Sequence, residues 1–313
     1  MIQVHEPVTT DVEIKQRVRE FYDSVGWTQV AEGVYQNARY EDLRPVSREY
    51  IHRCHQRVGR HLPAAGRLLL DAGSGPIQYP EYLEYSRGYR RRVCLDISHL
   101  ALSEARQRIG EHGLFVVGDI ADLPFRPGVF DGVVSLHAVH HLPAEEHRRG
   151  FSEFVRVLLP GGRGVVVYSW GKHALLTRLT APLIDLAFLL QHQYRRWRQQ
   201  GRPPAESVAR LKCAQAAGSA PEVSGTFTHK FDYAWVRANL SSLPGLEVRV
   251  WRSVSTAFLR AFIHQQFLGR LWLHILFQME ELAPRAFGRW GQYPMILFRG
   301  SSLNEAPAGE RQA

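Results

Sequence analysis

Short apolar runs alternate with amphipathic segments through the middle of the chain. Five runs have the length and composition of buried strands, and they lie at residues 68–71, 93–97, 114–117, 130–136 and 164–169. Segments with helical spacing or helix signals lie between them, at residues 79–85, 100–109 and 145–159. This alternation predicts an α/β fold in which right-handed crossovers join the strands of a doubly wound, mostly parallel sheet.

The sequence also predicts where several of these elements begin and end. Residues 86–92 are expected to form a loop before the second strand, and Pro160-Gly161-Gly162 is expected to end the third helix. Ser98 is placed to cap the start of the helix at residues 100–109. These signals set the expected bounds of the strands on either side.

The flanking regions are predicted to be more helical. Before the first strand, an aromatic stretch has helical spacing at residues 11–25 and 45–61. After the fifth strand, residues 174–198 form an apolar-then-basic helical pattern, and residues 199–228 are rich in Pro, Ala, Gly and Ser, which predicts a mobile loop. A helix, a strand, an apolar helical segment and a final strand are then expected at residues 231–240, 246–254, 257–284 and 293–298.

A glycine-containing loop follows the first predicted strand. It reads Asp71-Ala-Gly73-Ser74-Gly75-Pro76-Ile77, and its glycines allow the backbone to turn sharply and to approach a ligand closely. In doubly wound folds, loops at the carboxyl ends of parallel strands bind nucleotides. The loop therefore predicts a site for a ligand that contains a nucleoside.

Two further acids follow the next two strands. Asp96 ends the second strand, where a carboxylate can hold both hydroxyls of a ribose. Asp119, with Ile120 beside it, can address the edge and the face of an adenine. A dinucleotide fingerprint would need glycine where the chain has Gln78, and Asp71 would lie badly beside a pyrophosphate. A cofactor with a cationic centre and no phosphate suits these acids better.

Together these residues resemble class I S-adenosylmethionine-dependent methyltransferases over residues 68–170. Asp71-x-Gly73-x-Gly75 is similar to the first motif of that family, and Asp96 to its ribose-binding acid. Residues 118–125 are similar to the family's segment beside the adenine, residues 130–143 to its fourth-strand segment, and residues 159–162 to the turn before its fifth strand. These segments stand in the same order as in the family. One departure is Ile77, which stands where the family often has glycine.

The resemblance implies a Rossmann-like, seven-stranded sheet whose last strand is antiparallel. The chain adds helical insertions after strands five and six, and the resemblance does not extend to either of them. The resemblance implies S-adenosylmethionine as cofactor, bound by Asp71, Gly73, Ser74, Gly75, Asp96, Ile97, Asp119, Ile120 and His137. We divide the chain into a helical N-terminal lid or extension (1–64), a cofactor-binding methyltransferase core (65–170), a helical insertion with a mobile loop (171–230), completion of the core sheet with a helical insertion at 255–288 (231–300), and a disordered tail (301–313).

The expected reaction is an in-line displacement, which positioning and the exclusion of water can accelerate. An oxygen, nitrogen or carbon acceptor can also need a base, and His140 is the candidate because histidine titrates near neutral pH. Packing and hydrogen bonding at the strand end explain a histidine there more simply. No carboxylate completes a metal site with His137, His140 and His141, so no metal is expected.

The apolar insertions suggest what the acceptor is like. Residues 174–190 and 267–282 are more apolar than one core-facing stripe requires. Packing of the two segments against each other is the simpler explanation. The alternative is a small hydrophobic acceptor, reached at a membrane surface through the arginines at positions 195, 196 and 198.

Composition gives little information about what the protein binds. The formal charge is +9, but 35 of the 39 basic residues are arginine, so the charge is weak support for nucleic acid and no specific nucleic-acid partner is expected. Three cysteines without CxxC spacing argue against a disulfide framework and a structural zinc site. With no secretory signal or membrane-spanning run in view, we expect a cytoplasmic protein, with contact to the inner face of the membrane left open.

Two other functions stay open on the sequence alone. One is a nicotinamide-dependent oxidoreductase, and the other is a non-catalytic protein of the same fold that binds a cofactor or RNA. The acceptor and its reacting atom, the need for a base, the role of the insertions and the oligomeric state are not predicted by the sequence.

Overall fold

The computed structural model describes residues 10–31, 34–37, 41–200 and 226–301. Most of the loop predicted at residues 199–228, and nearly all of the tail predicted at 301–313, lie outside these described residues. Among the described residues, no helix combines the length and the apolarity needed to cross a bilayer.

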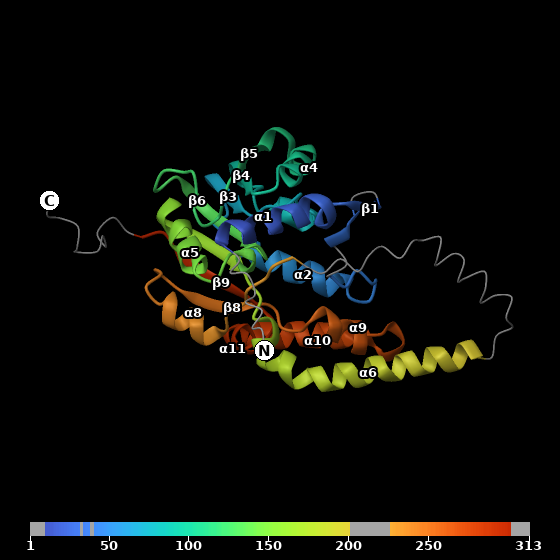
Figure 1. Ribbon diagram of the computed structural model, residues 1–313. Helices are drawn as coiled ribbons and strands as arrows, with labels where there is room; N and C mark the ends of the chain where they lie inside the picture. The colour runs from blue at the N-terminus through green and yellow to red at the C-terminus, as the bar shows by residue number, and fades with distance from the viewer. Residues whose placement is uncertain (1–9, 32–33, 38–40, 201–225, 302–313) are drawn as a thin grey trace, which may run out of the picture.

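A seven-stranded sheet forms the centre of the molecule (Figure 1). Its strand order is β5-β4-β3-β6-β7-β9-β8, and β9 runs antiparallel to both of its neighbours while the other pairs are parallel. The strands are β3 Gly66–Ala72, β4 Tyr89–Asp96, β5 Gly113–Val117, β6 Phe130–Leu136, β7 Leu158–Val167, β8 Glu247–Arg252 and β9 Tyr293–Arg299. The doubly wound sheet and its antiparallel last strand are therefore confirmed.

Helices cover both faces of this sheet. Adjacent residues of β3 point to opposite faces, so Leu69 joins one apolar core and Leu70 the other. The Leu70 side is covered by α5 (Glu146–Val157) and α8 (Tyr233–Asn239). The Leu69 side is covered by α2 (Arg48–Gly59), α3 (Pro80–Glu84), α4 (His99–Ile109), α9 (Thr256–Phe262) and α10 (Gly269–Leu282).

The N-terminal extension contains helices, as expected, and a small sheet that was not. Helix α1 (Asp11–Phe21) begins with a capping box formed by Thr10 and Glu13. It continues as one π-helical turn over Tyr22–Gly26, and the chain then forms a two-stranded sheet from β1 (Gln29–Ala31) and β2 (Val34–Tyr35).

Two predicted boundaries are wrong. Strand β4 begins at Tyr89 rather than at residue 93, because the Tyr89 ring packs against Gly66 and Gly132, which leave room for it. Helix α5 ends at Val157, before the Pro-Gly-Gly turn. Strand β7 then starts at the buried Leu158, and a register shift opposite β6, with Gly161 at φ 77°, carries the strand past the turn.

The insertions after the fifth and sixth strands are present. The first contains α6 (Leu175–Gln200), whose far end extends away from the sheet in Figure 1. The second was expected as one helical segment at residues 257–284, and it instead forms α9, α10 and then α11 (Pro284–Trp290). The break before α10 occurs at Leu268, which adopts the left-handed conformation with φ 55°.

Candidate functional site

The glycine loop directly follows β3, and its geometry requires small residues. Gly73 and Gly75 have φ values of 74° and 54°, in the left-handed region that favours glycine. A Cβ at Gly73 would lie 2.3 Å from the Cβ of Ala138, and one at Gly75 would lie 3.0 Å from the Trp27 ring. The amide groups of Gly73 and Ser74 both donate to the Leu95 carbonyl, which fixes the loop against β4.

The backbone conformation at Ile77 accounts for the glycine that the family often has at this position. The φ of Ile77 is 53°, so this residue adopts the left-handed conformation for which glycine is the usual residue. Its side chain is 1% exposed and belongs to the core beneath the loop, rather than to the surface that faces a ligand. The next residue, Gln78, does face the ligand side, and its buried Oε1 has no hydrogen-bond partner among the described residues.

A cavity of about 430 Å³ opens at the carboxyl ends of the central strands. This volume is in the range of small-molecule sites. All ten residues named from the sequence line it, namely Asp71, Gly73, Ser74, Gly75, Asp96, Ile97, Asp119, Ile120, His137 and His140. The structure thus brings them together at one place, while the role of each stays a prediction.

Asp96 accepts hydrogen bonds from two backbone amides, and its pKa is raised. Its Oδ2 accepts from the Gly75 amide at 2.9 Å, and its Oδ1 accepts from the Ser98 amide at 2.9 Å. Burial raises the pKa of this carboxyl to about 6, although both amide hydrogen bonds act in the opposite direction, and the charges of Asp71 and Asp23 add to the rise. The carboxylate is therefore tied to the glycine loop at the end of β4.

Asp71 is already paired within the protein. Arg92, which is fully buried in β4, donates to its Oδ2 from Nε at 3.1 Å and from Nη2 at 2.5 Å. The same arginine also donates to the Tyr82 carbonyl. This pair neutralises Asp71 beneath the loop, an arrangement that the predicted loop at residues 86–92 could not have indicated.

Asp119 is held by the N-terminal helix. Lys15 of α1 donates to Asp119 Oδ2 at 2.5 Å and to Glu146 Oε1 at 2.6 Å, while Asp119 Oδ1 accepts from the Ala121 amide at 2.8 Å. The Trp27 ring lies against Gly75, on the same side of the cavity. Helix α1 and the turn after it therefore cover the part of the cavity that the acids line.

The three histidines after β6 line the cavity, with His140 buried and His137 and His141 partly buried, and all three have lowered pKa values. Burial lowers the pKa of His137 to about 3 and that of His141 to about 4, and it lowers the pKa of His140 well below its ordinary value, with Lys230 adding to each shift. His141 donates from Nδ1 to the Phe227 carbonyl at 2.8 Å, so its Nε2 accepts from the Tyr22 hydroxyl at 2.8 Å. His140 Nδ1 has no partner among the described residues.

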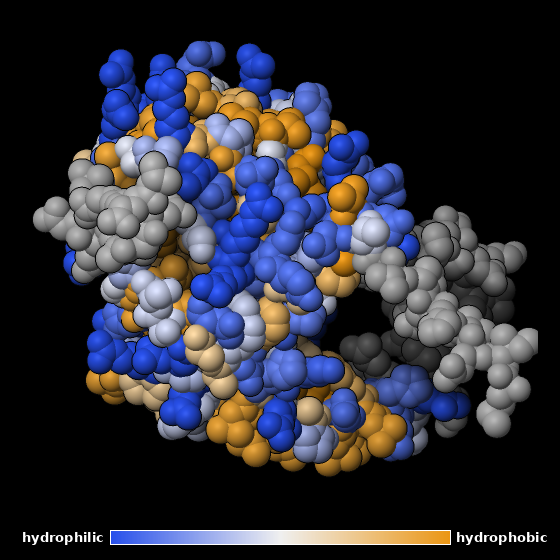
Figure 2. Space-filling model, turned by 60° about the vertical axis from the view of Figure 1, so that its left-hand side comes forward, coloured by the Kyte–Doolittle hydropathy of each residue, from blue (hydrophilic) through white to orange (hydrophobic). Residues whose placement is uncertain are grey.

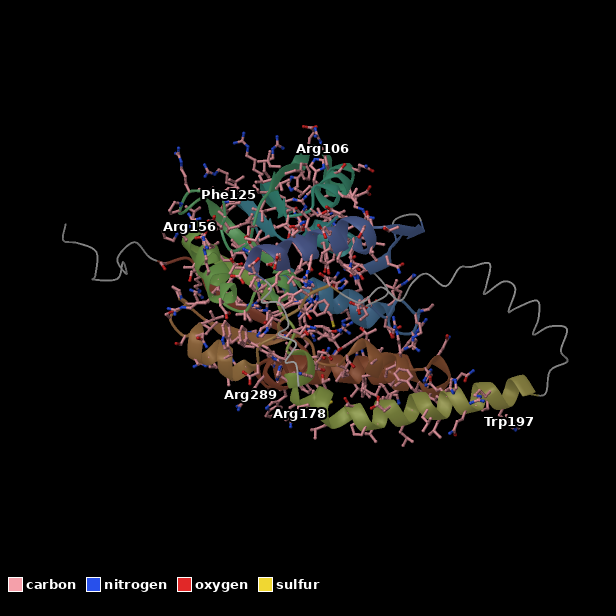
Figure 3. The ribbon with its side chains drawn as sticks, in the orientation of Figure 1. Arg106, Phe125, Arg156, Arg178, Trp197 and Arg289 are labelled. Carbon is pink, nitrogen blue, oxygen red and sulfur yellow. The ribbon has the colours of Figure 1, made fainter. Side chains whose placement is uncertain are left out.

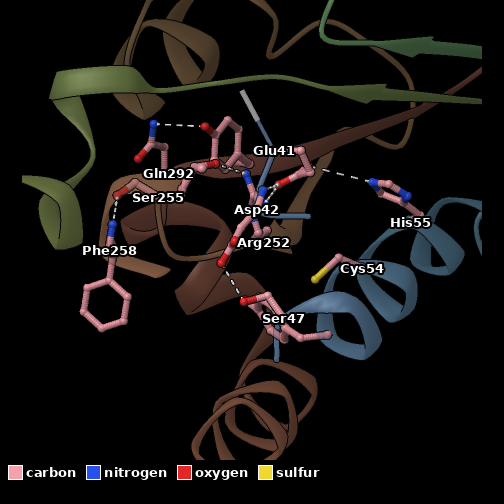
Figure 4. A network of polar contacts seen from close by, with 12 residues as sticks. Glu41, Asp42, Ser47, Cys54, His55, Arg252, Ser255, Phe258 and Gln292 are labelled. Atoms are coloured by element: carbon pink, nitrogen blue, oxygen red, sulfur yellow. Dashed lines mark hydrogen bonds and ion pairs between the residues drawn. The ribbon is translucent and has the colours of Figure 1, made fainter. Parts of the chain in front are cut away.

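The remaining wall of the cavity was missed from the sequence. Arg252 at the end of β8 pairs with Glu41, and Figure 4 shows Glu41 between Arg252 and His55. Thr226, Thr228, Lys230 and Tyr293 complete this wall. These residues come from the N-terminal extension, from the end of the first insertion and from β8 and β9, and no motif or spacing connects them along the chain.

No metal cluster is formed in the part of the chain that the structure describes. There, no group of three or more His, Cys, Asp or Glu side chains is arranged to hold an ion.

Comparison with known proteins assigns the centre of the chain. Residues 70–166 match a family model described as a methyltransferase domain. Residues 70–166 form a class I methyltransferase domain. S-adenosylmethionine is the cofactor of this domain.

Relatives and solved structures of methyltransferases are similar to parts of the chain. Probable tRNA methyltransferase 9B of Mus musculus is 31% identical over 42% of this chain and 28% of its own. Phthiotriol/phenolphthiotriol dimycocerosates methyltransferase 1 of Mycobacterium ulcerans (strain Agy99) is 32% identical over 40% of this chain and 49% of its own. The structure of magnesium protoporphyrin IX methyltransferase from Synechocystis PCC 6803 is 15% identical, covers 92% of this chain and 100% of its own, and has a TM-score of 0.47. The chain spans 22% to 49% of the length of the first curated relatives that it matches.

The residues of the methyltransferase domain fit this cofactor. Asp96, at a strand end beside a glycine loop, is placed to hold ribose hydroxyls, and the acid-lined part of the cavity suits a ligand with a cationic centre. Two buried polar atoms that face the cavity, Trp27 Nε1 and Gln78 Oε1, have no partner among the described residues, and a polar ligand would supply one.

Proposed function

We propose that this protein transfers a methyl group from S-adenosylmethionine to a small-molecule acceptor. The observation that carries the proposal is that the glycine loop, Asp96 and Asp119 line the same cavity as a separate set of side chains from the N-terminal extension, the end of the first insertion, β8 and β9. One cavity can therefore hold a cofactor and an acceptor side by side. When bound, the cofactor supplies an electrophilic methyl group on a sulfonium.

The chain's own contribution to catalysis is positioning. The Gly75 amide fixes Asp96, and Lys15, Tyr22 and Trp27 cover the cavity, so water is excluded and the reacting atoms are held in place. His140 lines the cavity with a free Nδ1, which can accept a hydrogen bond or a proton from the acceptor. Burial holds the pKa of His140 well below its ordinary value. We therefore assign His140 mainly to orienting the acceptor, and only secondarily to removing the acceptor's proton.

Calorimetry tests the cofactor part of the proposal. We expect S-adenosylmethionine and S-adenosylhomocysteine to bind and NAD not to bind. Asp96→Ala should weaken S-adenosylhomocysteine binding at least about tenfold, since a hydrogen bond to a charged group contributes about 1.5–3 kcal/mol. Asp122→Ala is the matched control, because Asp122 is exposed outside the cavity. Binding of NAD in place of these ligands would support an oxidoreductase instead.

Turnover tests the enzymatic part. S-adenosylhomocysteine should accumulate in the presence of an extract of small molecules, and His140→Gln should reduce the rate while leaving cofactor affinity unchanged. Bulk tRNA is included as a separate acceptor, because one of the relatives is named as a tRNA methyltransferase. Cofactor binding without consumption across all acceptors would support a non-catalytic binding protein.

We propose further that the acceptor is lipophilic and that the protein meets it at an anionic lipid surface. Helix α6 packs on α9, yet most of its large apolar side chains stay exposed, including Leu179 at 62% and Trp197 at 69%. Helix α10 adds Trp272 at 58%. Figure 2 shows hydrophobic surface gathered along the lower edge of the molecule, and the labelled Arg178 and Trp197 mark the two ends of α6 in Figure 3.

Charge complementarity favours lipid as the occupant of this surface. Arg178 and Arg196 are exposed among the apolar side chains of α6, and Asp185 is the one acid in that helix. An apolar helix face with exposed arginines is typical of segments that lie in the interface of an anionic bilayer. This chain is similar over 137 residues to phthiotriol/phenolphthiotriol dimycocerosates methyltransferase 1, and that similarity is compatible with a lipophilic acceptor.

Vesicle flotation tests this contact. The protein should float with vesicles that contain phosphatidylglycerol, in a salt-sensitive way, and not with pure phosphatidylcholine. Arg178→Gln with Arg196→Gln should weaken binding about tenfold or more, at about 1 kcal/mol per arginine. Leu114→Ser, on the exposed edge strand β5, is the control. No flotation, or a dimer that the α6 substitutions disrupt, would contradict the lipid contact.

A further inference from the structure

A short extended segment at residues 226–231 forms part of the wall of the cavity. Three hydrogen bonds hold it to the strand ends. The Phe227 carbonyl accepts from His141 Nδ1, the His229 amide donates to the His140 carbonyl, and the Phe231 amide donates to the Tyr168 hydroxyl. Every second residue, at 227, 229 and 231, is thus engaged with the protein.

The alternate residues point the other way. Side chains alternate along an extended chain, and Thr226, Thr228 and Lys230 are the members of this segment that line the cavity. On the opposite side, the Phe231 ring stacks on Trp235 with 3.9 Å between ring centroids. The pattern therefore presents two hydroxyls and one ammonium in a row along the cavity, with Thr228 exposed to solvent.

Two of the three donors in this row lack partners. Among the residues that the structure describes, the buried Thr226 Oγ1 has no hydrogen-bond partner, and Lys230 has no hydrogen bond or ion pair. The nearby cation Arg252 is already paired with Glu41, and the three histidines beside Lys230 are neutral. Lys230 is therefore a cation without a charged partner among the described residues, whereas Asp71 and Asp119 are paired with Arg92 and Lys15.

An uncompensated, partly desolvated ammonium beside a free hydroxyl is the arrangement that binds an oxyanion. We propose that Thr226, Thr228 and Lys230 form a subsite for an anionic group, a carboxylate or a phosphate, on the methyl acceptor. The acceptor is then amphipathic, with an anionic group held near the reacting end and an apolar remainder. This inference rests on the proposed methyltransferase function, since it assigns the second half of the same cavity.

The test uses the full-length protein saturated with S-adenosylhomocysteine. Three probes with the same naphthyl ring, 2-naphthoate, 2-naphthyl phosphate and the neutral 2-naphthamide, are titrated by calorimetry. At least one of the two anions should bind about tenfold more tightly than the amide, the size expected for a hydrogen-bonded charge. The stronger of the two anions distinguishes a carboxylate from a phosphate subsite.

Variants assign the preference to these residues. Lys230→Met should abolish the anion preference, and Thr226→Val, which removes one hydroxyl at nearly constant shape, should reduce it about threefold, the size of a typical neutral hydrogen bond. Lys172→Met is the matched control, because Lys172 is exposed outside the cavity. If Lys230→Met unfolds, Thr226→Val alone still decides the outcome.

Three results would overturn the subsite. They are an absence of anion preference in the loaded wild-type protein, a preference that survives both substitutions, and a loss of S-adenosylhomocysteine affinity in Lys230→Met equal to the loss for the anions. The last result would assign Lys230 to the carboxylate of the cofactor. Failure of S-adenosylhomocysteine to bind the wild-type protein would instead count against the proposed function itself.

Discussion

At the residue scale, Asp96 shows opposing effects on one carboxyl group. Burial raises its pKa to about 6, while the Gly75 and Ser98 amides stabilise its charged form. In the unfolded chain its pKa is near the ordinary 3.8. The folded protein therefore holds this proton between about pH 4 and 6, so the contribution of Asp96 to stability falls as pH rises through that window.

This pKa predicts the pH dependence of cofactor binding. In the proposed role of Asp96, its ionised carboxylate accepts from the ribose hydroxyls, so protonation of Asp96 should weaken binding. We expect the dissociation constant of S-adenosylhomocysteine to be flat above pH 7 and to rise about tenfold per pH unit below about pH 6. Calorimetry from pH 4.5 to 8 measures this profile. In Asp96→Asn the binding should be weak and flat, and an unchanged profile in that variant would exclude Asp96 as the titrating group.

Ile77 supports a prediction about backbone strain. Replacing it with Ala removes a buried side chain and keeps a left-handed backbone, whereas Gly removes the same side chain and relieves the backbone. Ile77→Gly should therefore be more stable than Ile77→Ala by about 1 kcal/mol in urea unfolding. At the helical control position Ile51 the order should reverse, with Ala more stable than Gly by about 1 kcal/mol. The same order at both positions would contradict the assignment of strain.

The residues of the two cavity walls differ in how far the sequence could reveal them. Asp71, Asp96 and Asp119 each follow a recognisable strand, so local pattern was enough to group them at one edge of the sheet. Lys230 and Arg252 could not be found in this way. Lys230 ends the first insertion and Arg252 ends β8, and only the tertiary fold brings both to the cavity that the glycine loop lines.

At the element scale, the same distinction separates elements with local signals from those set by tertiary contacts. Strand β6 has the predicted bounds because the apolar Phe130, Val133 and Val134 mark it within one short segment, and α4 begins after the predicted cap Ser98. Strand β4 was predicted too short because its start depends on Tyr89 packing on glycines of two neighbouring strands. Such contacts are invisible in a single segment.

Helix α1 is the element whose motion would control access to the cavity. It is attached to the core by Lys15, which joins Asp119 and Glu146, and by the Tyr22 hydrogen bond to His141. Lys15→Met should increase the hydrogen exchange of α1 amides about fivefold, because a partly exposed ion pair contributes about 1 kcal/mol to closure. S-adenosylhomocysteine should slow exchange in the same helix. Arg17→Met, on the exposed face of α1, is the control, and equal exchange in both variants would contradict this role of Lys15.

At the scale of the whole molecule, a buried ion pair joins the N-terminal extension to the second insertion. Arg57 of α2 donates to Glu280 of α10 at 2.8 Å and to the Trp251 carbonyl at 2.7 Å. Glu280 is fully buried and also accepts from the Tyr50 hydroxyl and from Ser253. The extension, β8 and the insertion therefore meet at one carboxylate, which suggests that they unfold together with the sheet.

Breaking this pair from one side should be costly, because it leaves a buried charge without its partner. Arg57→Met should lower the free energy of unfolding by about 3–5 kcal/mol. Adding Glu280→Gln removes the stranded charge and keeps an oxygen for Tyr50 and Ser253, so the double variant should regain about half of the loss. Urea unfolding followed by fluorescence and by circular dichroism should give one coincident transition in all three proteins. A double variant less stable than Arg57→Met, or an early transition confined to the extension, would show that Arg57 and Glu280 do not couple the extension to the core.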